Sequence, residues 1–174
     1  EKSGIDFLVC SGYKWLLAGT GNGFAMHKEQ ITERCHPKES GFNAAGANLA
    51  RFNKWPFYKY FEPGHLDSLA FGSLLFALKD LSAIGIEEIE KQNRLLARLA
   101  FNGLTHLGLL DTSFGENDSL SSIFNIKGDR DLYDHLKRNN VICSQRGKGI
   151  RLSFHYYNTV KELETLFEIL KSSY

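Results

Sequence analysis

The sequence has few of the residues that mark several protein classes. Its 174 residues include three cysteines, three prolines and one methionine. Cys10, Cys35 and Cys143 stand far apart and form no CxxC pair. This spacing fits a reducing compartment and argues against a disulfide framework or a structural zinc site. We therefore expect free thiols and a cytoplasmic location.

The chain also lacks a charge bias and a long apolar run. Twenty-one basic residues nearly balance 20 acidic ones, a net charge of +1, which gives no electrostatic reason to expect nucleic acid or an anionic membrane as a partner. No stretch approaches the roughly 18 consecutive apolar residues of a membrane span. The six histidines are scattered without the spacing of metal ligands, so we expect no metal site.

The chain opens on Glu1 rather than on methionine, and an apolar run begins almost at once. This beginning leads us to expect a piece of a longer protein. Residues 5–10 (IDFLVC) are typical of a strand buried on both faces of a parallel sheet, as in α/β proteins. A second strand is predicted at residues 24–27, after a turn with three glycines. Because a strand and no helix follows, this turn is not a dinucleotide-binding fingerprint.

The remaining pattern predicts an alternation of helices and short strands. Residues 66–81 predict a helix so apolar that we expect burial on most sides, and an amphipathic helix follows at 86–107. Further strands are expected near 107–111, 121–127, 141–145 and 149–155, with a helix at 129–139. A final helix should begin at Thr159, whose side chain forms a capping box with Glu162. Residues 29–63 show no sustained period and many aromatic residues, which favours an interface.

Lys14 lies at the end of the sharpest motif. The strand-like residues 6–10 lead into Ser11-Gly12-Tyr13-Lys14-Trp15, which places an amine at the edge of a sheet, beside apolar bulk. An amine must lose its proton before it attacks a carbonyl and forms an imine, and partial desolvation favours that loss. From the spacing alone, a lysine that extends from the sheet edge into solvent is the simpler interpretation.

Arg151 belongs to a second motif, IRLSFHYYN at residues 150–158. With the strand period of two, Arg151, Ser153 and His155 point to one face and the interleaved apolar residues to the other. Since the apolar face must meet the core, Arg151 faces outward or into a cleft. There a guanidinium on a rigid strand can hold a carboxylate through two hydrogen bonds. Without other evidence, a solvated strand arginine is the simpler interpretation.

Four segments, in this order, resemble the class V aminotransferase family of pyridoxal 5'-phosphate (PLP) enzymes. DFLVCSGYKWLL, with its glycine turn and GFAMH, is similar to the family's cofactor-lysine segment. FEPGH stands where the family has a Phe-Glu-x-Gly-Thr-like motif, and ALKDLSAIGIEEIEKQNRLL resembles its connection between domains. RLSFHYYNTVKEL resembles its closing motif and last helix. The resemblance implies an α/β fold: the end of the PLP-binding large domain at residues 1–84 and a small α+β domain at 85–174.

The resemblance assigns roles to five residues. Lys14 would be the Schiff-base lysine that holds PLP and moves the proton at the substrate's α-carbon. Ser11 and Tyr13 would hydrogen-bond the cofactor phosphate, and Arg151 would bind the α-carboxylate of an amino-acid substrate. In family dimers, the turn that ends at His65 would reach the phosphate of the partner subunit, although His65 replaces the usual threonine.

The resemblance also implies a homodimer and a site that this chain does not complete. In the family, the phosphate-binding turn, the group stacked on the pyridine ring and the aspartate paired with the ring nitrogen all precede the lysine. Only 13 residues precede Lys14. We therefore expect this chain alone to bind PLP poorly and to catalyse little.

The type of reaction stays open among transamination, epimerisation and β-elimination. Cysteine desulfurase is a less favoured alternative, because desulfurases usually carry histidine where this chain has Tyr13. They also carry a nucleophilic cysteine on a mobile loop, for which VICSQRGKGIR leaves no room; Cys143 is expected to be packed rather than reactive. His65, Arg146 and residues 52–61 are specificity candidates, although a structural role is the simpler interpretation of each.

A non-catalytic binding or dimerisation module is the competing class. The sequence shows no basic helix of the kind that a DNA-binding segment would carry. The presence of both Lys14 and Arg151 argues for chemistry, because a scaffold needs neither.

Overall fold

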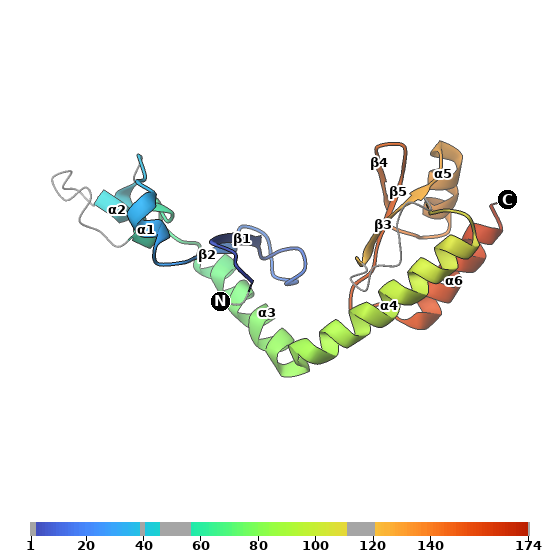
Figure 1. The fold of residues 1–174 in the computed structure, drawn as a ribbon, viewed down its shortest axis with the longest axis horizontal. Helices are drawn as coiled ribbons and strands as arrows, with labels where there is room; N and C mark the ends of the chain where they lie inside the picture. Colours follow the sequence, from blue (N-terminus) through green and yellow to red (C-terminus); the bar gives the residue numbers. More distant parts are fainter. Residues whose placement is uncertain (1–2, 39–40, 46–56, 111–120, 174) are drawn as a thin grey trace. The chain divides into compact units, whose positions relative to one another are not determined.

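The computed structural model describes residues 3–38, 41–45, 57–110 and 121–173 (Figure 1). The chain divides into two compact units, a first unit of Glu1–Ala83 and a second unit of Ile84–Tyr174. Phe52 and Trp55, two aromatic residues of the segment expected to form an interface, lie outside the described residues.

The first unit combines a hairpin with one long helix. Strands β1 (Phe7–Ser11) and β2 (Gly23–His27) pair antiparallel, with Ser11 opposite Gly23. Short helices α1 (Ile31–Arg34), α2 (Phe42–Ala45) and η2 (Phe57–Tyr60) follow, and α3 (Ser68–Ile84) ends the unit. Asp67 caps α3, because its Oδ1 accepts hydrogen bonds from the amides of Leu69 and Ala70 at 2.9 and 3.2 Å.

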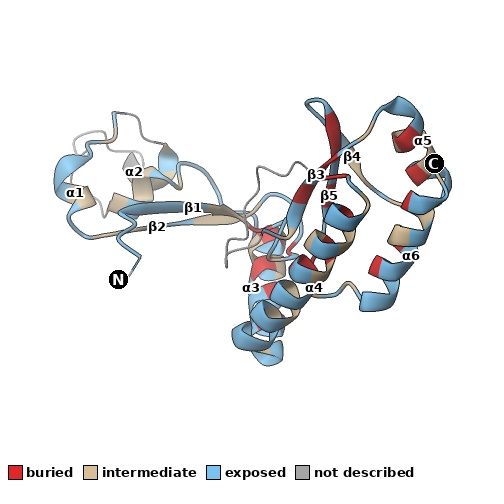
Figure 2. Ribbon diagram, turned by 45° about the vertical axis from the view of Figure 1, so that its right-hand side comes forward, coloured by how far each residue is buried: buried red, intermediate tan, exposed pale blue. Residues whose placement is uncertain are grey.

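Two expectations about burial in the first unit are wrong for this chain. β1 is neither parallel nor buried: β2 is its strand partner, and Val9 is 70% exposed. Helix α3 buries one stripe, Ala70, Leu74, Ala77 and Leu81, while Leu69 and Phe76 are 82% and 74% exposed. The physical reason is the same in both cases, since the described residues cover too little of either element to bury it on most sides (Figure 2).

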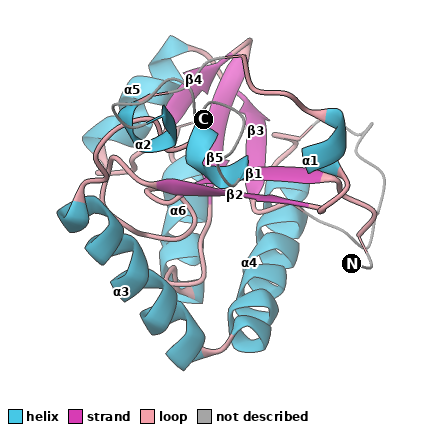
Figure 3. Cartoon of the chain, turned by 90° about the vertical axis from the view of Figure 1, so that its left-hand side faces the viewer, coloured by secondary structure: helices cyan, strands magenta, loops and turns pink. Residues whose placement is uncertain are grey.

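The second unit packs three helices against a small antiparallel sheet. Strands β3 (Ile123–Lys127), β4 (Ser144–Arg146) and β5 (Gly149–Ser153) are arranged in the order β3-β5-β4 (Figure 3). Helices α4 (Ile86–His106), α5 (Arg130–Arg138) and α6 (Val160–Lys171) accompany them. Their inward side chains form one continuous core, which includes Leu96, Leu104, Ile126, Leu136, Ile150 and Leu170, each less than 2% exposed.

The strand expected at residues 107–111 does not form within the described residues. Gly108 has a φ of +68° and ends α4 in a Schellman motif. The amide of Gly108 donates to Thr105 O at 2.9 Å, and that of Leu109 donates to Leu104 O at 3.0 Å. Leu109 and Leu110 are buried as expected of an apolar run, but the left-handed glycine turns the chain before a ladder can begin. The strand expected at 141–145 is shifted to β4.

No single helix in the described part of the chain is long and apolar enough to cross a membrane. The consecutive helices α3 and α4 meet that criterion of length and composition only when they are taken together as a bent pair.

Candidate active site

Lys14 lies in a turn that begins where β1 ends. Ser11 is the last strand residue, and the buried Gly12 follows it. The amide of Gly12 donates to Asn22 O at 3.1 Å, and its carbonyl accepts from the amide of Ala18 at 3.0 Å. The backbone of the lysine turn is therefore held at both ends by residues of the same loop.

Side chains then fasten this loop to α3. The Nδ2 of Asn22 donates to Gly19 O and to Ala70 O, both at 2.8 Å. The amide of Gly19 donates to the hydroxyl of Ser73 at 2.7 Å. The bonds to Ala70 and Ser73 bridge residues about fifty positions apart in sequence, so α3 supports the position of Lys14. Sequence reasoning missed Asn22 and Ser73, because such long-range hydrogen bonds leave no periodic pattern.

Most of the candidate side chains of this turn are open to solvent. Tyr13 and Lys14 are exposed and Ser11 is half-buried, so the partial desolvation expected for the amine is not supplied by the described residues. Lys14 Nζ lies 5.4 Å from the centre of the Tyr13 ring, at the range of a cation–π contact. An amine, a hydroxyl and a phenol on one short turn form a donor set that fits a phosphorylated aldehyde cofactor such as PLP.

His65 makes its contacts with residues outside this donor set. Its ring stacks on Phe42 at 5.6 Å between centres and an interplanar angle of 18°. Asn43 Nδ2 donates to Gly64 O at 2.8 Å and holds the turn in place. Within the described residues, His65 makes no hydrogen bond or ring contact with Ser11, Tyr13 or Lys14.

Arg151 occupies the middle of β5, the central strand of the sheet in the second unit. The alternation expected there is confirmed from residue 150 to residue 154: Ile150, Leu152 and Phe154 are buried, and Arg151 and Ser153 are exposed. The expectation for His155 is wrong, since His155 is only 8% exposed. β5 ends at Ser153, so the period of two no longer applies at His155.

Cys143 behaves as a core residue. It lies directly before β4 and packs half-buried against the core of the second unit. Burial raises the pKa of the Cys143 thiol, and the smaller effect of the Lys137 charge acts in the opposite direction. A thiol with a raised pKa is a poor nucleophile at neutral pH, which supports the expectation that Cys143 is packed.

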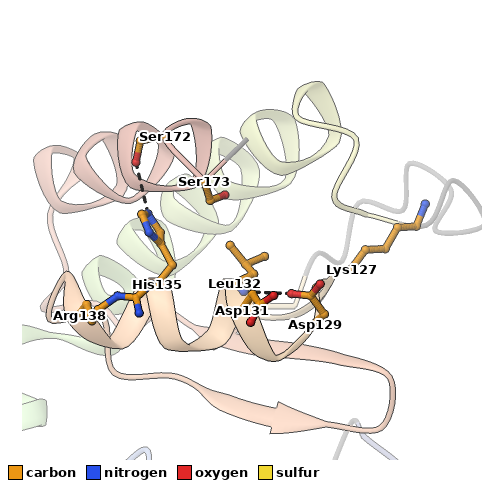
Figure 4. Close-up of a pocket in the computed structure, with 9 residues that line it drawn as sticks. Lys127, Asp129, Asp131, Leu132, His135, Arg138, Ser172 and Ser173 are labelled. Carbon is orange, nitrogen blue, oxygen red and sulfur yellow. Dashed lines mark hydrogen bonds between the residues drawn. The ribbon is translucent and has the colours of Figure 1, made fainter.

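The second unit also contains a pocket of about 580 Å³ between α5 and the C-terminal end of α6 (Figure 4). His135 Nε2 lies 3.1 Å from Ile169 O and 3.3 Å from the hydroxyl of Ser172. A carbonyl only accepts hydrogen bonds, so the tautomer with the proton on Nε2 fits this geometry. These contacts link α5 to α6. Both acidic and basic side chains line the pocket, and Arg151 is not among the lining residues. We therefore interpret the His135 contacts as structural and do not assign the substrate to this pocket.

Comparison with known proteins identifies a family for this chain. The model of the family "Aminotransferase class-V" matches residues 1–166. An uncharacterized aminotransferase, YcbU, of Bacillus subtilis is 27% identical over 92% of this chain and 43% of its own length. A probable cysteine desulfurase of Borreliella burgdorferi is 25% identical over 98% of this chain and 46% of its own length. The chain thus spans about half the length of the curated relatives that it matches.

Solved structures share the fold over nearly the whole chain. The cystine C–S lyase C-DES, in complex with cysteine persulfide, has a TM-score of 0.79 at 16% identity and covers 97% of this chain and 47% of the lyase. Serine palmitoyltransferase from S. paucimobilis, with bound PLP and myriocin, has a TM-score of 0.64 at 16% identity over 98% of this chain and 39% of the transferase. The expected α/β fold is confirmed, as is an enzyme family that uses PLP. With its family model matched over residues 1–166, this chain belongs to the class V aminotransferase family.

Proposed function

We propose that this chain supplies the C-terminal part of a PLP-dependent enzyme that acts on an amino acid. Lys14 holds the cofactor through its Nζ and moves the proton at the substrate's α-carbon. Ser11 and Tyr13 bind the cofactor phosphate. His65 reaches across a dimer interface and helps to bind the cofactor phosphate of the partner subunit. Arg151 binds the α-carboxylate of the substrate. When bound, PLP supplies the electron sink for the negative charge that develops at that carbon.

One observation carries this proposal: the lysine of the family's motif lies on a turn that two separate parts of the first unit hold in place. Catalytic groups need such positional support, because small displacements reduce the rate strongly. The hydrogen bonds of Gly12, Asn22 and Ser73 provide it. A lysine that merely extends into solvent would not need a braced backbone.

For the reaction, we favour transamination, epimerisation or β-elimination over cysteine desulfuration. Tyr13 precedes the lysine, and the half-buried thiol of Cys143, whose pKa is raised by burial, does not fit a sulfur acceptor. The relative from Borreliella burgdorferi, named a probable cysteine desulfurase, keeps desulfuration as the alternative. A non-catalytic module of the same fold is the second alternative.

We further propose that the full-length protein is a cytoplasmic homodimer. The free thiols of Cys10, Cys35 and Cys143 support a reducing compartment. The exposed apolar side chains of β1 and α3 support burial against another chain segment or subunit. Light scattering coupled to size exclusion tests the dimer, and a monomer at micromolar concentration would contradict it.

Absorbance spectroscopy of the full-length protein with added PLP tests the role of Lys14. We expect a band at roughly 410–430 nm that borohydride removes, and we expect Lys14→Ala to abolish it. Lys79→Ala, an exposed lysine of α3, is the matched control and should keep the band. An unchanged spectrum in the Lys14→Ala variant would refute the proposal. Screening of amino acids then separates release of a keto acid, racemisation and release of ammonia with pyruvate.

A further inference from the structure

The open face of the sheet in the second unit carries more positive charge than one carboxylate requires. The strand register identifies the residues on this face, because cross-strand partners and residues two apart on a strand point to the same side. One row has Arg151 at its centre, between Asn125 and Ser144. The next row contains Lys127, Gly149 and Arg146.

Gly149 gives this face its shape. A Cβ at this position would lie 2.4 Å from Ile126 O and 3.1 Å from Asn125 Oδ1, so no larger residue fits there. The Asn125 side chain lies over the glycine instead, and its Nδ2 donates to Arg146 O at 3.4 Å. This bond ties β3 to the end of β4 and fixes the backbone of Arg146 beside the row of Arg151.

The two arginines are available for a ligand within the described part of the chain. Both are exposed, and neither forms an ion pair with a described carboxylate. By contrast, Arg94 and Arg130 each pair with an acidic residue one helical turn away. Diagonal positions on adjacent strands lie about 7–8 Å apart, so two guanidiniums here can reach opposite ends of one small molecule.

We propose that Arg146 binds a second acid group of the substrate, which makes this sheet face selective for substrates with two acid groups. Arg151 takes the α-carboxylate, and Arg146 takes the acid group at the far end of the side chain. Lys127, on the other flank of Gly149, is diagonal to Arg151 in the same way as Arg146. Its ammonium adds to the positive potential but lacks the planar fork with which a guanidinium binds a carboxylate through two hydrogen bonds. This inference rests on the proposed function, in which Arg151 receives the α-carboxylate.

Calorimetric titration of the full-length protein without added PLP tests the inference independently of activity. The probes are glutarate and pentanoate, which have the same number of carbons but two carboxylates and one carboxylate. We expect Arg146→Gln to weaken glutarate binding about tenfold and to leave pentanoate binding unchanged, because a charged, bidentate hydrogen bond is lost. Arg98→Gln, which removes the same charge from an exposed position of α4, should change neither affinity.

The Arg151→Gln variant separates this inference from the proposed function. If Arg151 binds the α-carboxylate, this variant weakens both ligands. If it does so while Arg146→Gln weakens neither ligand, or weakens both equally, the inference about Arg146 is overturned and the proposed function stands. If Arg151→Gln changes neither affinity, the carboxylate site fails and the inference about Arg146 fails with it. Circular dichroism of each variant establishes that the second unit is folded.

Discussion

Leu17 has a backbone conformation that leucine rarely adopts. Its φ is 58°, three residues after Lys14, and its amide donates to Lys14 O at 3.0 Å. A left-handed conformation costs a residue with a side chain roughly 1–2 kcal/mol, and such strain tends to occur where function fixes the backbone. The hydrogen-bonded ends of the loop hold the turn in this shape.

Leu17→Asn should therefore stabilise the full-length protein by about 1 kcal/mol, because asparagine tolerates positive φ better than leucine does. The measurement is the midpoint of urea unfolding. Leu66→Asn is the control, since Leu66 is similarly exposed, 48% against 44%, and has no positive φ. A loss of stability with Leu17→Asn that matches the control would show that the leucine side chain, rather than the backbone, matters there.

Single residues also show how far the sequence could predict the candidate site. The alternation of β5 was enough to place Arg151 on the open face, because the apolar residues on either side must reach the core. The hydrogen bonds that hold the Lys14 turn on α3 could not be predicted, since Asn22 donates to Ala70 and Ser73 accepts from Gly19, each across about fifty residues of sequence. The stacking of the His65 ring on Phe42 likewise could not be predicted from a local sequence pattern.

Helix α6 illustrates an element that the sequence predicts in detail. The amide of Thr159 donates to Glu162 Oε2 at 2.7 Å, and the amide of Glu162 donates back to Thr159 Oγ1 at 3.2 Å. This is the expected capping box, complete in both directions. The hydrogen bonds from the backbone and then the side chain of Thr159 lower the pKa of the Glu162 carboxyl.

The lowered pKa of Glu162 predicts that the stability contributed by the N-terminal cap of α6 depends on pH. A carboxyl whose pKa is lower in the folded state stabilises the fold above its unfolded pKa, and this contribution is lost as the pH falls through the folded value. The stability difference between the unmodified protein and Glu162→Gln should thus be constant near neutral pH and shrink below about pH 4. Urea unfolding between about pH 3 and 7 checks this.

The matched control for that experiment is Glu164→Gln, on the same helix. The Glu164 carboxylate forms no hydrogen bond or ion pair with the described residues, so its removal should leave the pH profile unchanged. Parallel profiles for the unmodified protein and Glu162→Gln would contradict the role of the capping box.

Elements were predictable where a local signal decides them and not where tertiary surroundings do. The helices α3 to α6 follow from apolar periods and caps. The strand expected after α4 fails because Gly108 closes the helix with a left-handed turn. The apolar residues 5–10 predict a strand correctly, but the partner and the burial of β1 depend on what else lies beside it.

At the scale of the whole molecule, the two units differ in how much core each contains. Among the described residues, sixteen side chains form the buried cluster of the second unit. The buried cluster of the first unit consists of Ala18, Leu74 and Ala77. Because apolar burial is the main force that opposes chain entropy, the two units should differ greatly in their ability to fold alone.

Residues 84–174 expressed alone should therefore unfold in one cooperative urea transition, whereas residues 1–83 should show none. Far-UV circular dichroism during the titration measures both. The cooperative transition of residues 84–174 is expected without added PLP, because it depends on the apolar core of the second unit. A cooperative transition of residues 1–83 alone would contradict the prediction, because its few buried residues could not account for it.

The exposed apolar side chains of β1 and α3 set the conditions under which this chain can be handled. Val9, Leu69 and Phe76 present hydrocarbon to water, so a concentrated sample should self-associate at a rate that rises with protein concentration. Sulfate strengthens the association of apolar surface, whereas moderate urea weakens it. A preparation kept dilute, without sulfate, and in mild non-ionic detergent should give the chain its longest working life.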